Sequence, residues 1–324
     1  MTAGPDRMER LAGPAHRSVP PPDRPAAVAL GVFDGVHRGH QRILLEAVRW
    51  AAAEGWRAVG VTFANHPDEL LRGRAPAPLT TLDYRLRLLE RVGLDAARVL
   101  PFDRALREMT AQEFVERLLV RELGARGLVI GPGAALGRDR TGDEAELRRL
   151  GSRLGFEVRA TGPAHWGGEL VSSTRIRRAL EDGRLDDAAG MLGRPVSVFG
   201  PVVRGDGRGR ALGLPTANVD TGGALLPPRG VYAVQAGLPG GSWGCGACNV
   251  GVRPTFGGAN PTVEVHLLDW RGDLYGADLE VLFLRRLREE RAFAGPEELA
   301  RQIRADVEGV RALRDAGALR LHDG

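Results

Sequence analysis

The feature that most constrains this chain is the glycine-rich segment 31–40, which reads GVFDGVHRGH. An apolar run from Ala26 to Leu30 precedes it, and apolar residues at helical spacing follow it from Ile43 to Ala51. The pattern predicts a strand, a tight turn and a helix. The start of such a helix offers free N–H groups and a partial positive charge, which together bind phosphate.

Three glycines and two histidines lie within this segment. Gly31, Gly35 and Gly39 lack side chains at the points where the backbone must approach a phosphate. His37 and His40 are three residues apart, so they share one face of the predicted helix start. An ordinary connection with two surface histidines is the alternative. The flanking glycines favour a nucleotide-phosphate site.

The rest of the N-terminal half predicts a parallel sheet. The run 58–63 is a buried-strand pattern, and its spacing from the first strand predicts a right-handed βαβ unit. His66 then lies at the carboxyl end of a strand, where such sheets bind ligands. Further strands are expected at 99–102, 127–131 and 156–158, and helices at 80–89, 110–114 and 144–154.

The C-terminal half predicts a different architecture. Short β-rich runs at 196–199, 230–234, 262–267 and 279–283 alternate with glycine and proline, a pattern typical of a small antiparallel barrel. Residues 296–313 predict an amphipathic C-terminal helix. We therefore expect a disordered lead over residues 1–25, a first domain over 26–185 and a second over 186–324.

Candidate phosphate and metal ligands gather in the second domain. The segment 205–213 is glycine-rich and has no lysine, and backbone N–H groups in such a loop can hold phosphates. Thr216 and Asn218 follow, two residues apart, so their oxygens point the same way and suit a hard cation such as Mg²⁺. Glu264 and His266 share one face of a strand; a solvated strand face is the alternative interpretation.

Segment 31–40 resembles the HxGH signature of the nucleotidylyltransferase superfamily, in the form found in prokaryotic bifunctional riboflavin kinase/FMN adenylyltransferases (FAD synthetases). The TFxxHP strand end at 62–67 and the SSTRIR run at 172–177 match as well. The resemblance implies a Rossmann-like domain. It also implies catalytic roles for His37 and His40. The implied ATP-binding residues are Gly31, Phe33, Asp34, Gly35, Gly39, His66, Ser172, Ser173, Thr174 and Arg177.

The second half resembles riboflavin kinases. The matching segments are PTAN at 215–218, NVGVRPTF at 249–256 and DLYG at 273–276. The resemblance implies that Glu264 is the general base and that Asn249 and Arg288 bind flavin. It implies Mg²⁺ on Thr216 and Asn218. The implied ATP-binding residues of the kinase are Gly205, Gly207, Arg208, Gly209, Gly213 and Pro215.

The sequence departs from the family on the flavin side of the first domain. Ala64 and Asn65 stand where the family has an acid and a proline. The family's loop G-x-(D/N)-F-x-F-G is Gly131 to Gly137 here, without the polar residue or the aromatics. Loss of an aromatic platform costs on the order of 1 kcal/mol or more in flavin binding. ATP recognition is thus expected to be intact and flavin recognition altered.

Composition restricts the partners. The 45 basic residues are all arginine, and the net charge is only +4. Arginine, histidine or a metal must therefore supply any side-chain cation at a phosphate, and the dispersed charge does not require nucleic-acid binding. No apolar run is long enough for a membrane span. Cys245 and Cys248 are interpreted as small packing residues, which favours a cytoplasmic location; oligomeric state is left open.

The sequence therefore predicts a bifunctional enzyme of FAD biosynthesis with riboflavin, FMN and ATP as its substrates. The C-terminal domain would convert riboflavin to FMN, and the N-terminal domain would convert FMN to FAD with release of pyrophosphate. Three alternatives remain: a riboflavin kinase whose N-terminal domain has altered flavin or nucleotide specificity, one whose N-terminal domain only binds nucleotide as a regulator, and a nucleic-acid-binding protein.

Overall fold

The computed structural model describes residues 8–13, 22–205, 209, 213–255, 258–319 and 321. They divide into two compact units, Met1–Pro78 with Arg85–Ser173, and Leu79–Tyr84 with Thr174–Gly324. The division at Ser173 comes before the predicted boundary near residue 185. Helix α8 (Leu185–Leu192) and all but the first residue of α7 (Ser173–Glu181) therefore group with the C-terminal unit.

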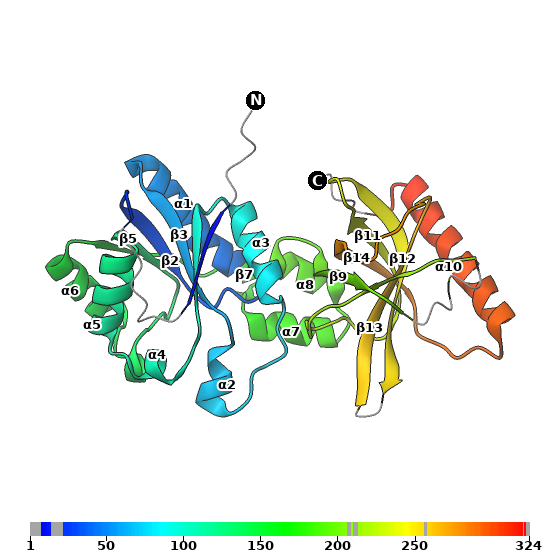
Figure 1. The fold of residues 1–324 in the computed structure, drawn as a ribbon, viewed down its shortest axis with the longest axis horizontal. Helices are drawn as coiled ribbons and strands as arrows, with labels where there is room; N and C mark the ends of the chain where they lie inside the picture. The colour runs from blue at the N-terminus through cyan, green and yellow to red at the C-terminus, as the bar shows by residue number, and fades with distance from the viewer. Residues whose placement is uncertain are drawn as a thin grey trace. The chain divides into compact units, whose positions relative to one another are not determined.

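The first unit is built on the parallel sheet that the βαβ pattern predicts. Its strands are β1 (Glu9–Ala12), β2 (Ala26–Leu30), β3 (Arg57–Phe63), β4 (Ala96–Leu100), β5 (Ala125–Ile130) and β6 (Glu157–Ala160). They lie in the order β1-β4-β3-β2-β5-β6, and each neighbouring pair is parallel. The central strands are buried apolar runs because helices cover both faces, with α1 (Arg38–Glu54) on one side and α6 (Glu144–Leu154) on the other (Figure 1).

The remaining elements of this unit are connected by turns with clear capping signals. Thr110 and Glu113 form the predicted capping box at the start of α5, and Gly55 ends α1 in the left-handed conformation. The other elements are α2 (Pro67–Arg72), α3 (Leu82–Val92), α4 (Arg104–Glu108), α5 (Ala111–Phe114), a π-helix (Val115–Glu122), a 3₁₀ turn (Arg138–Arg140) and a hairpin of β7 (His165–Trp166) and β8 (Glu169–Leu170).

The disordered lead predicted for residues 1–25 is wrong at Glu9–Ala12, which form β1 beside β4. The reason is a buried arginine. Arg98 on β4 pairs with Glu122 and also donates hydrogen bonds to the carbonyl oxygens of Leu11 and Gly13. A buried guanidinium needs acceptors on all sides, so these carbonyls hold the strand in place. The sequence of Glu9–Ala12 does not indicate that Arg98, far away in the chain, will bind its carbonyl groups.

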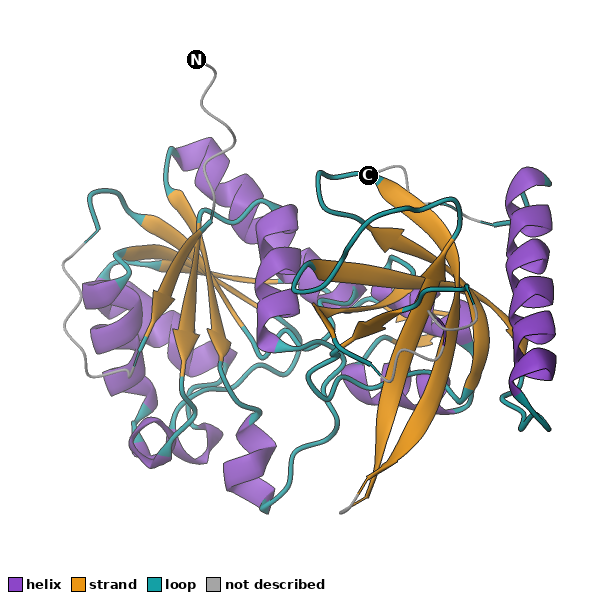
Figure 2. Cartoon of the chain, turned by 45° about the vertical axis from the view of Figure 1, so that its right-hand side comes forward, coloured by secondary structure: helices purple, strands orange, loops and turns teal. Residues whose placement is uncertain are grey.

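The second unit contains the predicted antiparallel barrel. Its strands are β9 (Val196–Val203), β10 (Ala217–Val219), β11 (Gly230–Gly237), β12 (Trp243–Thr255), β13 (Gly258–Leu267) and β14 (Asp278–Arg288). They close in the order β10-β13-β12-β11-β14-β9, and helix α10 (Pro296–Asp315) follows (Figure 2). Val307 and Val310 of α10 pack with Ala233, Ala247 and Leu268. Closure leaves no long open edge.

Cys248 is buried in β12, as a packing residue should be, and Cys245 is half-buried; both are free thiols. Within the described part of the chain, no helix combines the length and apolar character that crossing a bilayer requires.

Tyr84 connects the short segment Leu79–Tyr84 to the barrel. Its hydroxyl donates a hydrogen bond to Glu280 at 2.6 Å and lies 2.5 Å from the hydroxyl of Ser197. Its ring stacks on Phe199 with centroids 5.6 Å apart. Burial is the main cause that raises the pKa of Tyr84 from 10.0 to about 12, with a contribution from the Glu280 carboxylate. The neutral phenol is therefore part of the folded state.

Replacing Tyr84 with phenylalanine removes a donor from the buried Glu280 carboxylate. We expect Tyr84→Phe to lower the free energy of unfolding by about 1–3 kcal/mol at neutral pH, measured by urea unfolding. Because the pKa of Tyr84 is raised on folding, its contribution is complete below pH 10 and is lost as the pH rises through about 12. The stability gap between the two proteins should therefore narrow over that range, and a constant gap would contradict this assignment.

Candidate functional site

The glycine-rich turn between β2 and α1 has an unusual backbone. Phe33 and Val36 adopt positive φ angles of 52° and 41°, and Gly35 has φ 83°. A β-branched residue in the left-handed region is strained, and such strain persists only where surrounding contacts enforce it. Here Gln41 donates a side-chain hydrogen bond to the carbonyl of Val36 at 2.9 Å, and Val36 N–H bonds the Phe33 carbonyl. The turn is thus held in one shape.

The structure brings His37 and His40 together, as their spacing predicts. Their rings stack with centroids 3.6 Å apart and an interplanar angle of 16°. His37 caps α1, because its Nδ1 accepts a hydrogen bond from the backbone N–H of His40 at 3.3 Å. A Cβ on Gly39 would lie 3.1 Å from the His37 ring, which explains the glycine between them. Both imidazoles therefore lie at the positive end of a helix.

The serine-rich motif begins beside this turn. Ser173, the first residue of α7, donates its hydroxyl hydrogen to the carbonyl oxygen of Asp34 at 3.1 Å. Ser172 precedes it in the first unit, whereas Thr174 and Arg177 continue the helix in the second. The Ser173 hydroxyl is therefore adjacent to the backbone of the glycine-rich turn, and both are suited to binding phosphate oxygens.

A buried arginine that sequence reasoning missed supports the glycine-rich turn through hydrogen bonds to the end of β3. Arg85 is 7% exposed and donates to the carbonyl of Phe63 at 2.9 Å and to the hydroxyl of Thr62 at 3.3 Å. Thr62 in turn donates to the carbonyl of Val32 at 2.9 Å. Burial lowers the pKa of Arg85, and the nearby Asp34 charge opposes that shift. An Arg within the amphipathic α3 gave no local signal of this role.

A cavity of about 1050 Å³ lies at the carboxyl ends of β2 to β5, where parallel sheets bind ligands. His66 lines it and caps α2 by accepting a hydrogen bond from the N–H of Asp68 at 3.1 Å. Phe63 and Phe102 also line it and form an edge-to-face pair with centroids 5.6 Å apart. These phenylalanines supply aromatic surface that the loop from Gly131 to Gly137 lacks, and sequence reasoning did not connect them.

In the barrel, the strand register places four predicted residues in one row. Asn218 faces Glu264, Glu264 faces Asn249, Asn249 faces Val231, and Val231 faces Arg288. Directly paired residues of an antiparallel sheet share one face with Cβ atoms about 4.5–5.5 Å apart. The predicted metal ligand, general base and flavin residues therefore follow one another across β10, β13, β12 and β14, with Val231 of β11 between them.

The glycines before the Pro-Thr-Ala-Asn segment leave room for its side chains. A Cβ on Gly205 would lie 2.4 Å from the Asn218 amide nitrogen, and a Cβ on Gly209 would lie 3.2 Å from the Thr216 hydroxyl. Gly213 has φ +74° at the turn into the segment. The other two predicted loop residues, Gly207 and Arg208, lie outside the described residues.

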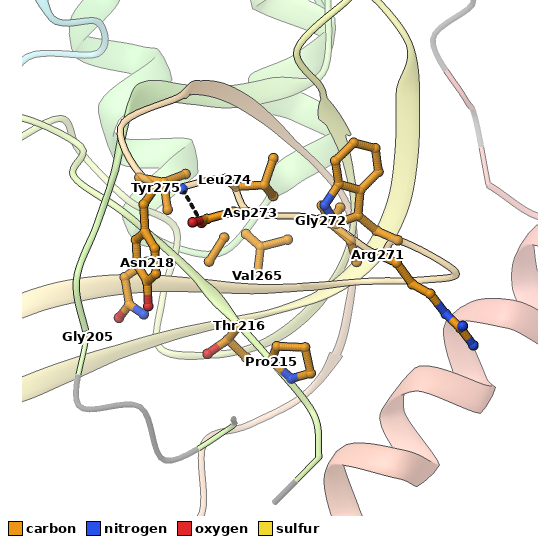
Figure 3. Close-up of a pocket in the computed structure, with 14 residues that line it drawn as sticks. Gly205, Pro215, Thr216, Asn218, Val265, Arg271, Gly272, Asp273, Leu274 and Tyr275 are labelled. Atoms are coloured by element: carbon orange, nitrogen blue, oxygen red, sulfur yellow. Dashed lines mark hydrogen bonds between the residues drawn. The ribbon is translucent and has the colours of Figure 1, made fainter. Parts of the chain in front are cut away.

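A pocket of about 210 Å³ surrounds the Thr216 and Asn218 side chains (Figure 3). The loop after β13 forms its other wall, where Asp273 accepts a hydrogen bond from the N–H of Tyr275 at 2.9 Å. Arg271 extends away from the labelled polar groups. The lining residues are Val202, Gly205, Pro215, Thr216, Ala217, Asn218, Val265, Leu267 and Trp270 to Tyr275.

Neighbouring contacts fix both ends of the polar row. His266 Nδ1 lies 2.8 Å from the carbonyl oxygen of Pro215, so β13 holds the segment that carries Thr216. At the other end, Arg288 forms a bidentate ion pair with Asp306 of α10, with its shortest contact at 2.7 Å. Arg288 thus has a structural partner besides any ligand. Burial and the Glu264 charge raise the pKa of Cys248, which stays a neutral thiol behind the row.

Comparison with known proteins finds two family models along the chain. The FAD synthetase family model matches residues 19–175 and the riboflavin kinase family model matches residues 192–314. A bifunctional riboflavin kinase/FMN adenylyltransferase of Escherichia coli is 38% identical over 90% of this chain and 93% of its own length. That of Pseudomonas fluorescens is 40% identical over 93% and 96%.

Among solved structures, one described as a macrolide-efflux protein from Streptococcus pneumoniae superimposes with a TM-score of 0.79 at 29% identity. The match covers 94% of this chain and 99% of that one. The two family models together match most of the chain, and the relatives align along nearly their whole length. The chain belongs to the family of bifunctional riboflavin kinase/FMN adenylyltransferases, with an FAD synthetase domain followed by a riboflavin kinase domain.

Proposed function

We propose that riboflavin is phosphorylated at the row of polar residues across the barrel strands, Asn218, Glu264, Asn249 and Arg288. The terminal ribityl hydroxyl oxygen attacks the γ-phosphorus of ATP, and ADP leaves. Glu264 accepts the hydroxyl proton as the new P–O bond forms. Its register position, with Asn218 on one side and Asn249 on the other, is the single observation that carries this assignment. The Glu264 carboxylate lies between Asn218, the proposed metal ligand, and Asn249, the proposed flavin contact. We propose that it takes the proton from this position.

The residues beside Glu264 fit a divalent cation. Thr216 and Asn218 offer two neutral oxygens at the pocket, and Mg²⁺ is commonly held by few protein ligands together with substrate phosphates. We propose that these two side chains hold Mg²⁺, which neutralises charge on the transferring phosphate when bound. Gly205, Gly209, Gly213 and Pro215 keep the backbone close enough for the nucleotide. Gly207 and Arg208 are proposed to complete that loop.

In the first domain we propose adenylyl transfer to FMN. An FMN phosphate oxygen attacks the α-phosphorus of ATP, and the bond to the leaving pyrophosphate breaks. His37 and His40 stabilise the negative charge that develops on the phosphates in the transition state. Their stacked rings lie together at the start of α1, so both can act on the same charge. The backbone around Gly31, Phe33, Asp34, Gly35 and Gly39, together with His66, Ser172, Ser173, Thr174 and Arg177, is proposed to bind the nucleotide.

Asn249 and Arg288 are proposed to contact riboflavin in the barrel, with Arg288 oriented by Asp306. FMN is proposed to occupy the cavity lined by Phe63 and Phe102. Two free cysteines suit a reducing compartment, and we propose that the enzyme works in the cytoplasm.

Replacing Glu264 with glutamine tests the kinase base. We expect Glu264→Gln to reduce FMN formation from riboflavin by about 10²–10⁴-fold, because the amide accepts no proton. FAD formation from supplied FMN should be unchanged and serves as the internal control. Both products are separated by chromatography. Wild-type turnover of riboflavin in this variant would refute the role of Glu264.

Replacing His37 or His40 with asparagine tests the adenylyltransferase site. Each change should reduce FAD formation from supplied FMN by about 10²–10³-fold, because a group that stabilises transition-state charge is lost. The rate of FMN formation from riboflavin should stay at the wild-type value. A variant that makes FAD normally would show that its imidazole does not take part.

The close approach of Gly205 to Asn218 gives a steric test. We expect Gly205→Ala to raise the KM for MgATP in the kinase reaction, because the new Cβ displaces the Asn218 amide. Gly309→Ala is the matched control, since nothing lies within 4 Å of a Cβ at that position in α10. Unchanged KM values in both variants would remove Asn218 from the nucleotide site.

A further inference from the structure

We propose that the ion pair between Asp269 and Arg311 of α10 positions one wall of the kinase pocket and thereby sets its affinity for MgATP. The inference rests on the proposed phosphorylation of riboflavin at this site. Neither side chain is among the described residues that line the pocket. Both are therefore positioning residues, which act through the loop that begins directly after Asp269.

The wall in question is a single loop between β13 and β14. Its residues Trp270 to Tyr275 supply six of the 14 residues that line the pocket (Figure 3). The proposed metal ligands Thr216 and Asn218 line the same pocket. The conformation of this loop therefore sets the space that remains for a nucleotide bound through those ligands.

Backbone hydrogen bonds fix the two ends of the loop. At one end, the N–H of Leu268 donates to the carbonyl of Cys245 at 2.8 Å. At the other end, the N–H of Gly276 donates to the carbonyl of Val202 at 2.9 Å. These bonds belong to the barrel strands and their ends. The direction in which the chain leaves Leu268 depends on the next residue.

Asp269 turns the chain from α10 toward the pocket. Its φ angle is +58°, a left-handed conformation that few residues other than glycine adopt, although aspartate and asparagine tolerate it. Its carboxylate accepts two hydrogen bonds from the guanidinium of Arg311, each at 3.0 Å, and one from Arg314 at 3.4 Å. A bidentate pair fixes orientation as well as distance. The helix thus holds the residue at which the wall begins.

Helix α10 is a firm support for this contact. Val307 and Val310 of the helix pack in one buried cluster with Leu268, the residue before Asp269. Asp306 pairs with Arg288 at the proposed flavin end of the row. Asp306 and Arg311 are five residues apart, which is about 7.5 Å along a helix axis. Each ion pair is therefore expected to affect a different substrate.

The exposure of the pair separates positioning from stability. The Asp269 side chain is 59% exposed and that of Arg311 is 34% exposed. Ion pairs of this kind contribute little to the free energy of unfolding. Their removal should leave the chain folded and free the loop to turn away from the pocket. Small misplacements of a binding surface weaken the binding of the ligand that it contacts.

The test uses two single variants and their combination in the full-length chain. Asp269→Asn removes the charge but keeps a residue that tolerates the left-handed backbone, and Arg311→Gln removes the guanidinium. We expect each to raise the KM for MgATP in riboflavin phosphorylation about fivefold, with kcat and the KM for riboflavin within about twofold of wild type. The double variant should match the singles, because the two residues act as a unit.

Arg304→Gln is the matched control. Arg304 is an exposed arginine of the same helix that has no hydrogen bond or ion pair among the described residues. Its replacement should leave all three kinetic constants at wild-type values. FAD formation from supplied FMN is measured for every variant and reports that the chain is folded.

Three results would overturn the proposal: an unchanged KM for MgATP in both single variants, an equal rise in the KM for both substrates, or effects that add in the double variant. The first would show that the loop keeps its position without the pair. The second would indicate general disturbance of the barrel, and the third would show that the two residues act independently. A wild-type chain that does not phosphorylate riboflavin would instead contradict the proposed function.

Discussion

Strand register in the barrel is the constraint on which the kinase assignment depends. Hydrogen-bonded pairing of β10, β13 and β12 puts Glu264 opposite Asn218 on one side and Asn249 on the other. A slip of one residue would turn the carboxylate to the opposite face and separate it from both amides. Closure of the barrel and the contact between His266 and Pro215 oppose such a slip. The proposed kinase site thus depends on the strand pairing more than on the conformation of any single loop.

The first domain solves the same problem of phosphate binding by a different route. It has no lysine to use, so the proposed phosphate site consists of the positive end of α1, two stacked imidazoles and the strained backbone at Val36. Strain of this kind must be enforced from outside the turn. Arg85 and Thr62 do so by connecting the end of β3 to the carbonyl of Val32. The buried Arg85 therefore contributes by holding the end of β3 in place.

Local sequence patterns predicted most helices and strands because hydrophobic periodicity and capping depend on residues that are close in the sequence. The helix after the glycine-rich turn, the capping box at Thr110 and the alternating barrel strands are all present. What sequence alone did not reveal depends on distant partners. Strand β1 needs Arg98, and the aromatic pair in the cavity of the first unit needs Phe63 of β3 and Phe102, which follows β4. The paired motifs pointed to the correct family, while the cavity shape required the fold.

The central claim is that two separate sites each perform one step. The most direct measurement mixes two variants that each lack one activity, Glu264→Gln and His37→Asn, with riboflavin and ATP. If the steps are separate, FMN released by the second protein feeds the first, and the mixture makes FAD from riboflavin although neither protein does so alone. A mixture that forms no FAD, while the His37→Asn protein alone accumulates FMN and the Glu264→Gln protein alone converts supplied FMN, would contradict passage of FMN between independent sites.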